Sequence, residues 1–312
     1  MIKRKRTSIS NGFLLAITAA VLWGVSGTFG QFLFQKRDIN PEWLVTVRLL
    51  FSGAILLLIA STNNPKELWR IWKVKKDAWQ LLSFSLFGML AVQYTYFAAI
   101  KHSNAATATV LQYVGPVLIA VYIAIQKEKW PRNTEILAIF LAITGTFLLV
   151  THGSFRSLSI SNWALFWGIA SAVALAFYSL QPMGLLSRYP ATIVIGWSML
   201  IGGVFLSSIH APWIVRGQWD IYTYLSTAFI ILLATLVAFY AYLTAVKIIG
   251  AQKASLLASA EPLSATILSV VWLQVPFTAM DWIGSCLIVA TIFLLASTKE
   301  VKAKNLEPQN SI

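Results

Sequence analysis

Long apolar stretches, separated by short polar ones, run along almost the whole chain. Each is roughly 20 residues long, the length a helix needs to cross a hydrocarbon core of about 30 Å at about 1.5 Å per residue. The alternation of apolar and polar residues that a membrane β-barrel requires is not seen. The pattern therefore predicts transmembrane helices. We expect ten of them, at 12–34, 44–61, 79–100, 105–126, 134–151, 162–186, 192–210, 222–245, 251–273 and 280–297.

The composition agrees with this pattern. The chain is 58% hydrophobic and 11% charged, which gives more apolar surface than one soluble core can bury. Connections such as "KHSNA" and "SRYPA" are too short to form domains of their own. The expected fold class is an all-α polytopic membrane protein. The first apolar run, 13–34, is too long for a secretory signal and shows no cleavage pattern, so it is read as the first span.

Basic residues concentrate on one side of the expected membrane. With a cytoplasmic N-terminus, 18 of the 24 lysines and arginines fall in cytoplasmic segments, five in the opposite loops and one, Arg48, within a span. Cytoplasmic loops retain Lys and Arg during insertion. We therefore expect a multi-pass protein of the cell membrane with both termini in the cytoplasm. Residues 1–11 would be a basic N-terminal segment and residues 298–312 a polar tail.

The net charge of +13 has the same explanation. Nucleic-acid binding is the alternative, but the basic residues flank the spans and no separate basic domain carries them. The expected partner is the lipid bilayer, not a nucleic acid. The segment 66–79 either lies on the inner surface of the bilayer or is an ordinary loop. The single cysteine, Cys286, lies in an apolar stretch and offers neither an intramolecular disulfide nor a metal cluster. We expect no metal.

The chain resembles itself at an offset of 146 residues. "AIKHSNAATATVLQYVGPV" from Ala99 aligns without a gap with "AVKIIGAQKASLLASAEPL" from Ala245, so that Pro116 meets Pro262. This predicts a duplicated unit that includes the fourth and ninth expected spans.

Two five-helix units, 12–151 and 162–297, follow from this offset. Because five is odd, the second unit enters the membrane from the opposite side, and the two units are inverted repeats. Such repeats give a protein two related shapes, each open to one face, around a site near the membrane midplane. The organisation therefore predicts a transporter.

Several stretches carry the features of a known family. "QYVGPVLIAVY" followed by Glu128, its counterpart "ASAEPLSATILSVVWLQ", and "DWIGSCLIVATIFLL" resemble the paired repeats of EamA transporters in the drug/metabolite transporter superfamily. "AVLWGVSGTFG" and "RLLFSGAILLL" are similar to that family's first two spans. The resemblance covers residues 12–297 and implies ten helices in a basket that transport small metabolites such as amino acids, often outward. The chain departs from the pattern at Gln274, which stands where the first repeat has Glu128.

Glu261 is a charge in the middle of an expected span. A charge near the bilayer centre costs roughly 2.5 to 3.5 kcal/mol, so it should face the bundle interior or a wet cavity. Pro262 follows it directly and is expected to distort the helix and free backbone carbonyls, as Pro116 would in the first repeat. Glu261 either binds substrate or protons, or ties helices together through a hydrogen-bonded carboxyl. The residues leave both readings open.

Arg48 lies a few residues inside the second span. It either captures a substrate carboxylate or gates the outer side, or else it anchors the helix at the headgroups. Polar and aromatic residues inside other spans are further candidates for a substrate pocket. They are Trp23, Gln93, Tyr94, Tyr96, Gln112, Tyr113, Tyr178, Gln181 and Tyr240.

Other function classes lack support in the sequence. No catalytic constellation is visible, since the three histidines are scattered and no His-Glu-x-x-His motif is present. Glycines 24, 27 and 30 fit close helix contacts and not a nucleotide loop, so neither ATP nor another cofactor is expected. A channel would show a filter motif or a ring of charge. We expect a secondary transporter of a small organic molecule, driven by protons or by exchange, acting as a monomer or homodimer. An intramembrane enzyme or a channel-like protein is the alternative.

Overall fold

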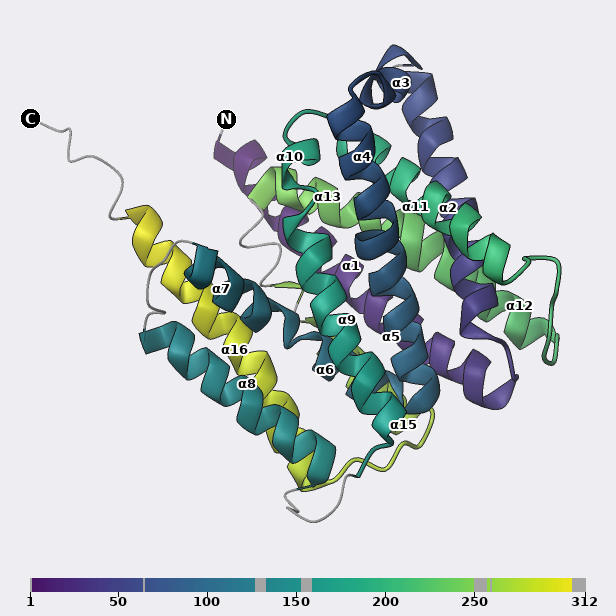
Figure 1. Ribbon diagram of the computed structural model, residues 1–312. Coiled ribbons are helices and arrows are strands. Elements are labelled where there is room, and N and C mark those ends of the chain that lie inside the picture. Colours follow the sequence, from purple (N-terminus) through teal and green to yellow (C-terminus); the bar gives the residue numbers. More distant parts are fainter. Residues whose placement is uncertain are drawn as a thin grey trace, which may run out of the picture.

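The computed structural model describes residues 2–63, 65–126, 133–152, 159–249, 257–258 and 260–304, and every element within them is a helix (Figure 1). The first half contains α1 (Ile2–Lys36), α2 (Pro41–Asn63), α3 (Pro65–Lys73), α4 (Lys75–Ser83), the π segment η1 (Phe84–Leu90), α5 (Ala91–His102), α6 (Ala105–Gln112), α7 (Gly115–Gln126) and α8 (Asn133–Thr151). The second half contains α9 (Asn162–Leu180), α10 (Met183–Leu186), α11 (Ala191–Ile209), α12 (Ile221–Ala228), the π segment η2 (Phe229–Val237), α13 (Ala238–Ile249), α15 (Ala260–Val271) and α16 (Ala279–Lys304).

Within the described residues, six helices are long and apolar enough to cross a membrane. They are Ser10–Lys36, Pro41–Thr62, Lys75–His102, Asn162–Leu186, Ala191–Ile209 and Ile221–Tyr242. The other four expected spans contain shorter apolar helices, namely Ala105–Ile119, Ile136–Leu149, Ala260–Val271 and Ala279–Thr291. Large apolar side chains such as Leu58, Phe87 and Phe140 are mostly exposed on the outside of the bundle. This is the architecture of a polytopic helical membrane protein, in which lipid covers the outer apolar surface.

Three of the expected spans are interrupted, one of them, 162–186, by a turn at Gln181 and Pro182 between α9 and α10. The expected span 105–126 consists of α6 and α7, with a turn at Tyr113 and Val114 between them. In the described part of 251–273, a turn at Ala258 precedes α15. Pro116 and Pro262 were expected to kink continuous helices, but each is the second or third residue of a new helix, α7 and α15. A proline is well tolerated there, because its missing N–H would have no partner within the helix.

The irregular segments recur at the offset of 146 residues. Shifted by this offset, η1 falls within η2, and the start of α8 falls on the start of α16. The turn between α6 and α7 likewise falls next to the start of α15. A π segment inside a helix widens one turn and redirects the side chains on it. The two halves therefore carry the same local departures from regular helix.

Several contacts between helices of the two halves come in matching pairs. α2 packs on α11 and α8 on α16, while the contact of α5 with α9 is matched by the contact of α13 with α1. α8 and α16 lie side by side in Figure 1 and approach closely at Gly145 and Gly284. A Cβ added to Gly145 would stand 2.7 Å from the carbonyl oxygen of Gly284, so this crossing requires glycine. These contacts join elements of the first half to elements of the second at positions that correspond under the offset of 146 residues.

Ion pairs join connecting segments at both ends of the bundle. Arg37, after α1, pairs with Asp220, before α12, at 2.9 Å. Asp220 also accepts from the backbone N–H of Thr223, and this hydrogen bond, with those from the Thr223 and Arg37 side chains, lowers the pKa of its carboxyl. At the other end, Arg188 pairs with the buried Asp77 at 2.9 Å. Each pair connects the first half of the chain to the second.

The helix α3 lies along one end of the bundle beside α2 and α4. Its Leu68 and Ile71 are buried, whereas Trp69 is 56% exposed. Trp79, in α4, is 65% exposed. An amphipathic helix with an exposed tryptophan fits the expected position at a membrane surface.

Candidate functional site

A cavity of about 180 Å³ lies between the two halves of the chain. Its walls come from α1, α2, η1, α5 and α6 of the first half and from α9, α13 and α15 of the second. It is lined by Trp23, Ser26, Arg48, Met89, Val92, Gln93, Tyr96, Gln112, Leu175, Tyr178, Phe239 and Glu261. One cationic and one anionic side chain therefore share a largely aromatic and apolar chamber.

Arg48 faces the interior of the bundle and is 7% exposed. Its Nε donates a hydrogen bond to Oγ1 of Thr235, in η2, at 2.7 Å, and its guanidinium carbon lies 5.4 Å from the centre of the Phe97 ring. The two terminal nitrogens make no hydrogen bond to the described residues. This position is not that of an interfacial anchor, because the side chain does not reach the surface. The free donors match the fork geometry that binds a carboxylate.

Glu261 lies in the first turn of α15 and is partly exposed to the cavity. Its Oε2 accepts a hydrogen bond from the Tyr113 hydroxyl at 3.1 Å, and the same hydroxyl lies 2.8 Å from the carbonyl oxygen of Ala258. Tyr113 is itself in the turn between α6 and α7. The interruption in the first half therefore contacts the interruption in the second, and the contact holds the carboxyl in place.

Gly24 explains how α15 comes so close to α1. A Cβ on Gly24 would stand 2.6 Å from the carbonyl oxygen of Glu261 and 2.9 Å from the backbone nitrogen of Ala265. No other residue leaves room for this contact with backbone atoms. Gly24 therefore allows close packing of two helices next to the site, which is the role that the sequence predicted for it.

Two further polar residues connect helices around the cavity. The Tyr96 hydroxyl lies 2.7 Å from Oγ1 of Thr109, so α5 is joined to α6. Nε2 of Gln112 donates to the Ser171 hydroxyl at 2.7 Å, which joins α6 to α9. Both bonds are buried and fix the end of α6 beside the cavity.

Two buried polar atoms in the wall have no hydrogen-bond partner among the described residues. They are Oγ of Ser26 and Oε1 of Gln93, in side chains that are 3% and 8% exposed. An unpaired buried polar group is costly, by about 1–3 kcal/mol, and a bound molecule or water that pairs it recovers that cost. A ligand bound in the cavity can form hydrogen bonds with these two atoms.

Aromatic residues form another part of the wall, which we call the aromatic wall. Trp23 packs edge-on against Phe239 with ring centres 5.4 Å apart, and against Tyr242 at 5.3 Å. Tyr178 packs against Phe84 at 5.5 Å. Rigid aromatic surfaces of this kind accommodate an apolar portion of a ligand.

The structure brings together most of the residues expected at the site. Seven of them line the cavity, namely Trp23, Arg48, Gln93, Tyr96, Gln112, Tyr178 and Glu261, and Tyr113 lies directly behind Glu261. Tyr94 lies elsewhere, where it donates to Glu42 at 3.2 Å and packs on Trp167. Tyr240 is 73% exposed on the outside of the bundle, and Gln181 bonds to the backbone of Gln80 near α10.

Other lining residues escaped the sequence reasoning. Ser26, Met89, Val92, Leu175 and Phe239 are small or apolar and look like ordinary packing in a membrane helix. The internal offset would have indicated one of the missed positions. It pairs Phe239 with Gln93, which was expected at the site.

Comparison with known proteins places this geometry in context. The model of the EamA-like transporter family matches twice, over residues 10–151 and 162–297. A protein of Salmonella typhimurium described as "Uncharacterized inner membrane transporter YicL" is 40% identical over 95% of this chain and 99% of its own length. "Uncharacterized transporter YwfM" of Bacillus subtilis is 25% identical over 91% of this chain and 93% of its own length. A solved crystal structure shares the fold with a TM-score of 0.61 at 19% identity, over 96% of this chain and 99% of its own.

Proposed function

Since the chain belongs to the EamA-like transporter family and is a multi-pass membrane transporter, we propose that it moves a small amphiphilic metabolite of the amino-acid kind by alternating access. Export is the proposed direction, and the proton gradient or exchange is the proposed driving force. Both termini are proposed to lie in the cytoplasm.

The observation that carries the proposal is the pairing of Arg48 and Glu261 in one cavity. A zwitterion presents a carboxylate and an ammonium group, for which a guanidinium and a carboxyl are the complementary partners. Ser26 and Gln93 add unpaired polar atoms, and the aromatic wall adds a surface for an apolar side chain. The volume of about 180 Å³ suits a small molecule and not a peptide or a lipid.

Alternating access is supported by the paired architecture. Two five-helix units at 12–151 and 162–297 would be related by an axis in the membrane plane, because the irregular segments and the packing contacts recur in pairs. The two matches of the family model divide the chain in the same way. The interruptions at Tyr113 and before Glu261 place helix ends at the cavity, which is the arrangement that discontinuous transporter helices use to bind ions and polar substrates.

The cargo and the direction are tested together by comparing metabolites. Cells that overexpress the protein and cells with an empty vector are grown alike, and their media are compared by mass spectrometry. Accumulation of one zwitterionic metabolite in the medium of the overexpressing cells is the expected result. Media that do not differ in any zwitterion contradict the proposal.

The role of the paired charges is tested with the cargo so identified. The wild-type protein, Glu261→Gln and Arg48→Gln are reconstituted in liposomes, and uptake is measured with and without a pH gradient. Both substitutions are expected to abolish transport, because each removes one charge that the zwitterion binds. Tyr240→Phe, on the exposed outer surface, is the control and should transport normally. Normal transport and pH dependence in Glu261→Gln would show that the acid is structural.

A further inference from the structure

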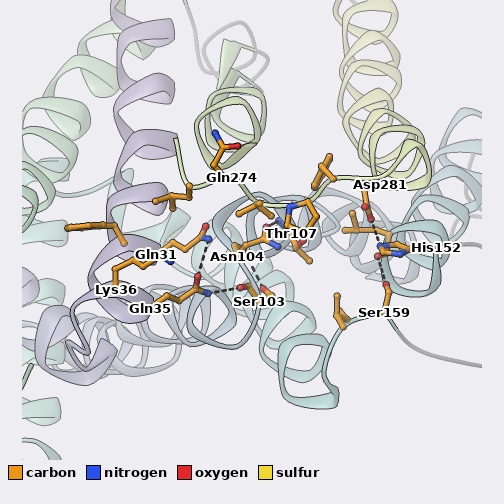
Figure 2. Close-up of a pocket in the computed structure, with 17 residues that line it drawn as sticks. Gln31, Gln35, Lys36, Ser103, Asn104, Thr107, His152, Ser159, Gln274 and Asp281 are labelled. Carbon is orange, nitrogen blue, oxygen red and sulfur yellow. Dashed lines mark hydrogen bonds and ion pairs between the residues drawn. The ribbon is translucent and has the colours of Figure 1, made fainter. Parts of the chain in front are cut away.

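A second and larger pocket, of about 390 Å³, opens at the end of the bundle where α1 finishes. Figure 2 shows side chains from α1, the start of α6, the end of α8 and the connection between α15 and α16 converging on it. Its polar lining residues are Gln31, Gln35, Lys36, Ser103, Asn104, Thr107, His152, Ser159, Gln274 and Asp281. We call it the outer pocket. Its size falls in the range of about 300–1,000 Å³ typical of small-molecule sites.

The outer pocket and the central cavity are stacked along the same two helices. On α1, Ser26 lines the cavity and Gln31 lines the outer pocket. On α6, Gln112 lines the cavity and Thr107 lines the outer pocket. Five residues of helix correspond to about 7.5 Å, so the two chambers are neighbours on one line.

A thin polar layer separates the two chambers. It includes the bond between Tyr96 and Thr109, and the bond from the backbone N–H of Ala105 to Oε1 of Gln31 at 2.8 Å. Oγ of Ser269, on α15, lies 3.5 Å from the same oxygen of Gln31. A molecule that leaves the central cavity on this side must therefore pass into the outer pocket.

The acceptor groups of the outer pocket are mostly engaged already. Oδ1 of Asp281 pairs with Nε2 of His152 at 2.9 Å, and its Oδ2 accepts from the backbone and hydroxyl of Thr278. Gln31 and Gln35 bond to each other, and Gln35 bonds to the carbonyl of Ser103. Figure 2 shows the bonds between Gln31 and Gln35 and between Gln35 and Ser103, and the pair of His152 with Asp281. Oε1 of Gln274 is an acceptor that makes no bond to the described residues.

Three donors in the pocket are free. The Lys36 ammonium makes no ion pair within the described part of the chain. The Thr107 hydroxyl makes no hydrogen bond to the described residues, although the side chain is 4% exposed. Asn104 caps α6 through Oδ1, which leaves its amide N–H groups available. Lys36 is the last residue of α1, whereas Asn104 and Thr107 are the N-cap and a first-turn residue of α6, where the helix dipole also favours a negative group.

From these contacts we propose that the outer pocket is a second binding site, which takes a small molecule through its carboxylate. Lys36, Thr107 and Asn104 would hold the carboxylate, and Oε1 of Gln274 would accept from an ammonium group. The inference rests on the proposed function in that the expected ligand is the transported zwitterion. It adds a site through which that molecule passes between the central cavity and the solution.

The test is protection of an engineered cysteine in purified protein. Leu273→Cys, on the pocket wall, is made in a Cys286→Ser background, because Cys286 is exposed. The rate of reaction of this cysteine with a maleimide is measured without added ligand, with each of the common L-amino acids, and with the matching α-amides. A ligand at ten times its Kd leaves about one tenth of the protein unoccupied. It should slow the reaction about tenfold, because the maleimide reacts only with protein whose pocket is empty. We expect protection by an amino acid and none by its amide. Val275→Cys, also on the pocket wall, is a second reporter.

Further variants separate the two sites. Lys36→Gln should remove the protection, and Lys36→Arg should keep it. Glu261→Gln should leave it intact, whereas Val215→Cys, exposed before α12, should react at the same rate with every compound. No protection at either reporter, protection by amides as strong as by acids, or loss of protection in Glu261→Gln would overturn the inference. Protection by a carboxylate that the protein does not transport would contradict the proposed cargo but would still support a second binding site.

Discussion

Nε of Arg48 and Oγ1 of Thr235, which belong to opposite halves of the chain, are joined by a hydrogen bond of 2.7 Å. The Thr235 hydroxyl in turn donates to the carbonyl of Ile230 at 2.8 Å. That carbonyl lies five residues earlier, a spacing that the π segment η2 brings into register. The irregular helix in the second half thus sets the orientation of the arginine from the first half.

Thr235→Val is expected to slow transport at nearly constant side-chain volume. It removes the acceptor for Arg48, and a hydrogen bond to a charged group contributes about 1.5–3 kcal/mol. The substrate carboxylate would then meet a guanidinium that is no longer held, so we expect uptake into liposomes to fall about tenfold or more, since about 1.4 kcal/mol is a factor of ten.

Thr235→Ser is the matched control, because it keeps the hydroxyl and loses a methyl group. Its uptake should remain close to that of the wild-type protein. Equal uptake by the valine and wild-type proteins would show that the bond does not position Arg48 for transport.

The ion pair between Arg188 and Asp77 should stabilise the fold more than a surface pair does. The Asp77 side chain is 3% exposed, and it also accepts from the Tyr189 hydroxyl at 2.7 Å. Arg188→Met removes one partner of a buried acceptor, which costs about 1–3 kcal/mol. The midpoint of thermal unfolding in detergent should therefore fall measurably.

Arg70→Met provides the comparison for this pair. Arg70 is bonded to Glu67, which raises the pKa of Arg70, but the Arg70 side chain is 53% exposed and that of Glu67 is 27% exposed. Exposed pairs contribute little, because water and salt screen them. The midpoint of Arg70→Met should stay close to that of the wild-type protein. If the two variants unfold alike, burial of Asp77 does not strengthen its ion pair.

Six of the ten expected spans are apolar helices long enough to cross a membrane within the described residues, because the bilayer sets a strong demand on apolar length. Glu261 and Arg48 were visible for the same reason, since a charge stands out in an apolar stretch. The interruptions before α7 and α15 were anticipated as kinks, because proline and glycine signal irregular backbone without showing whether a helix bends or ends.

The rest of the site depends on contacts between distant segments. Tyr94 and Tyr96 are both tyrosines in one helix, and the sequence alone could not show that Tyr96 faces the cavity whereas Tyr94 faces Glu42. Ser26 looks like any small residue of a membrane helix until its neighbours are known. Residues of the outer pocket come from four segments that meet at one end of the bundle, so no local pattern predicts it.

Gly145→Ala is expected to destabilise the protein, although it adds one methyl group. Its Cβ would stand 2.7 Å from the carbonyl oxygen of Gly284, and no side-chain rotation relieves a contact with backbone. α8 and α16 must separate, at a cost of about 1–3 kcal/mol. Gly184→Ala is the control, because its Cβ would meet nothing closer than 3.4 Å. Thermal unfolding in detergent measures both.

Gly284→Ala should cost a similar amount, since its Cβ would stand 2.6 Å from the carbonyl oxygen of Gly145. Once one alanine has pushed α8 and α16 apart, the second should find part of the space already open. The double variant should therefore lose less stability than the two single losses added together, a departure from additivity that neighbouring sites show. Strict additivity would mean that the two glycines do not share one crossing. A fall confined to one of the two single variants would mean that the halves do not contribute equally to this contact.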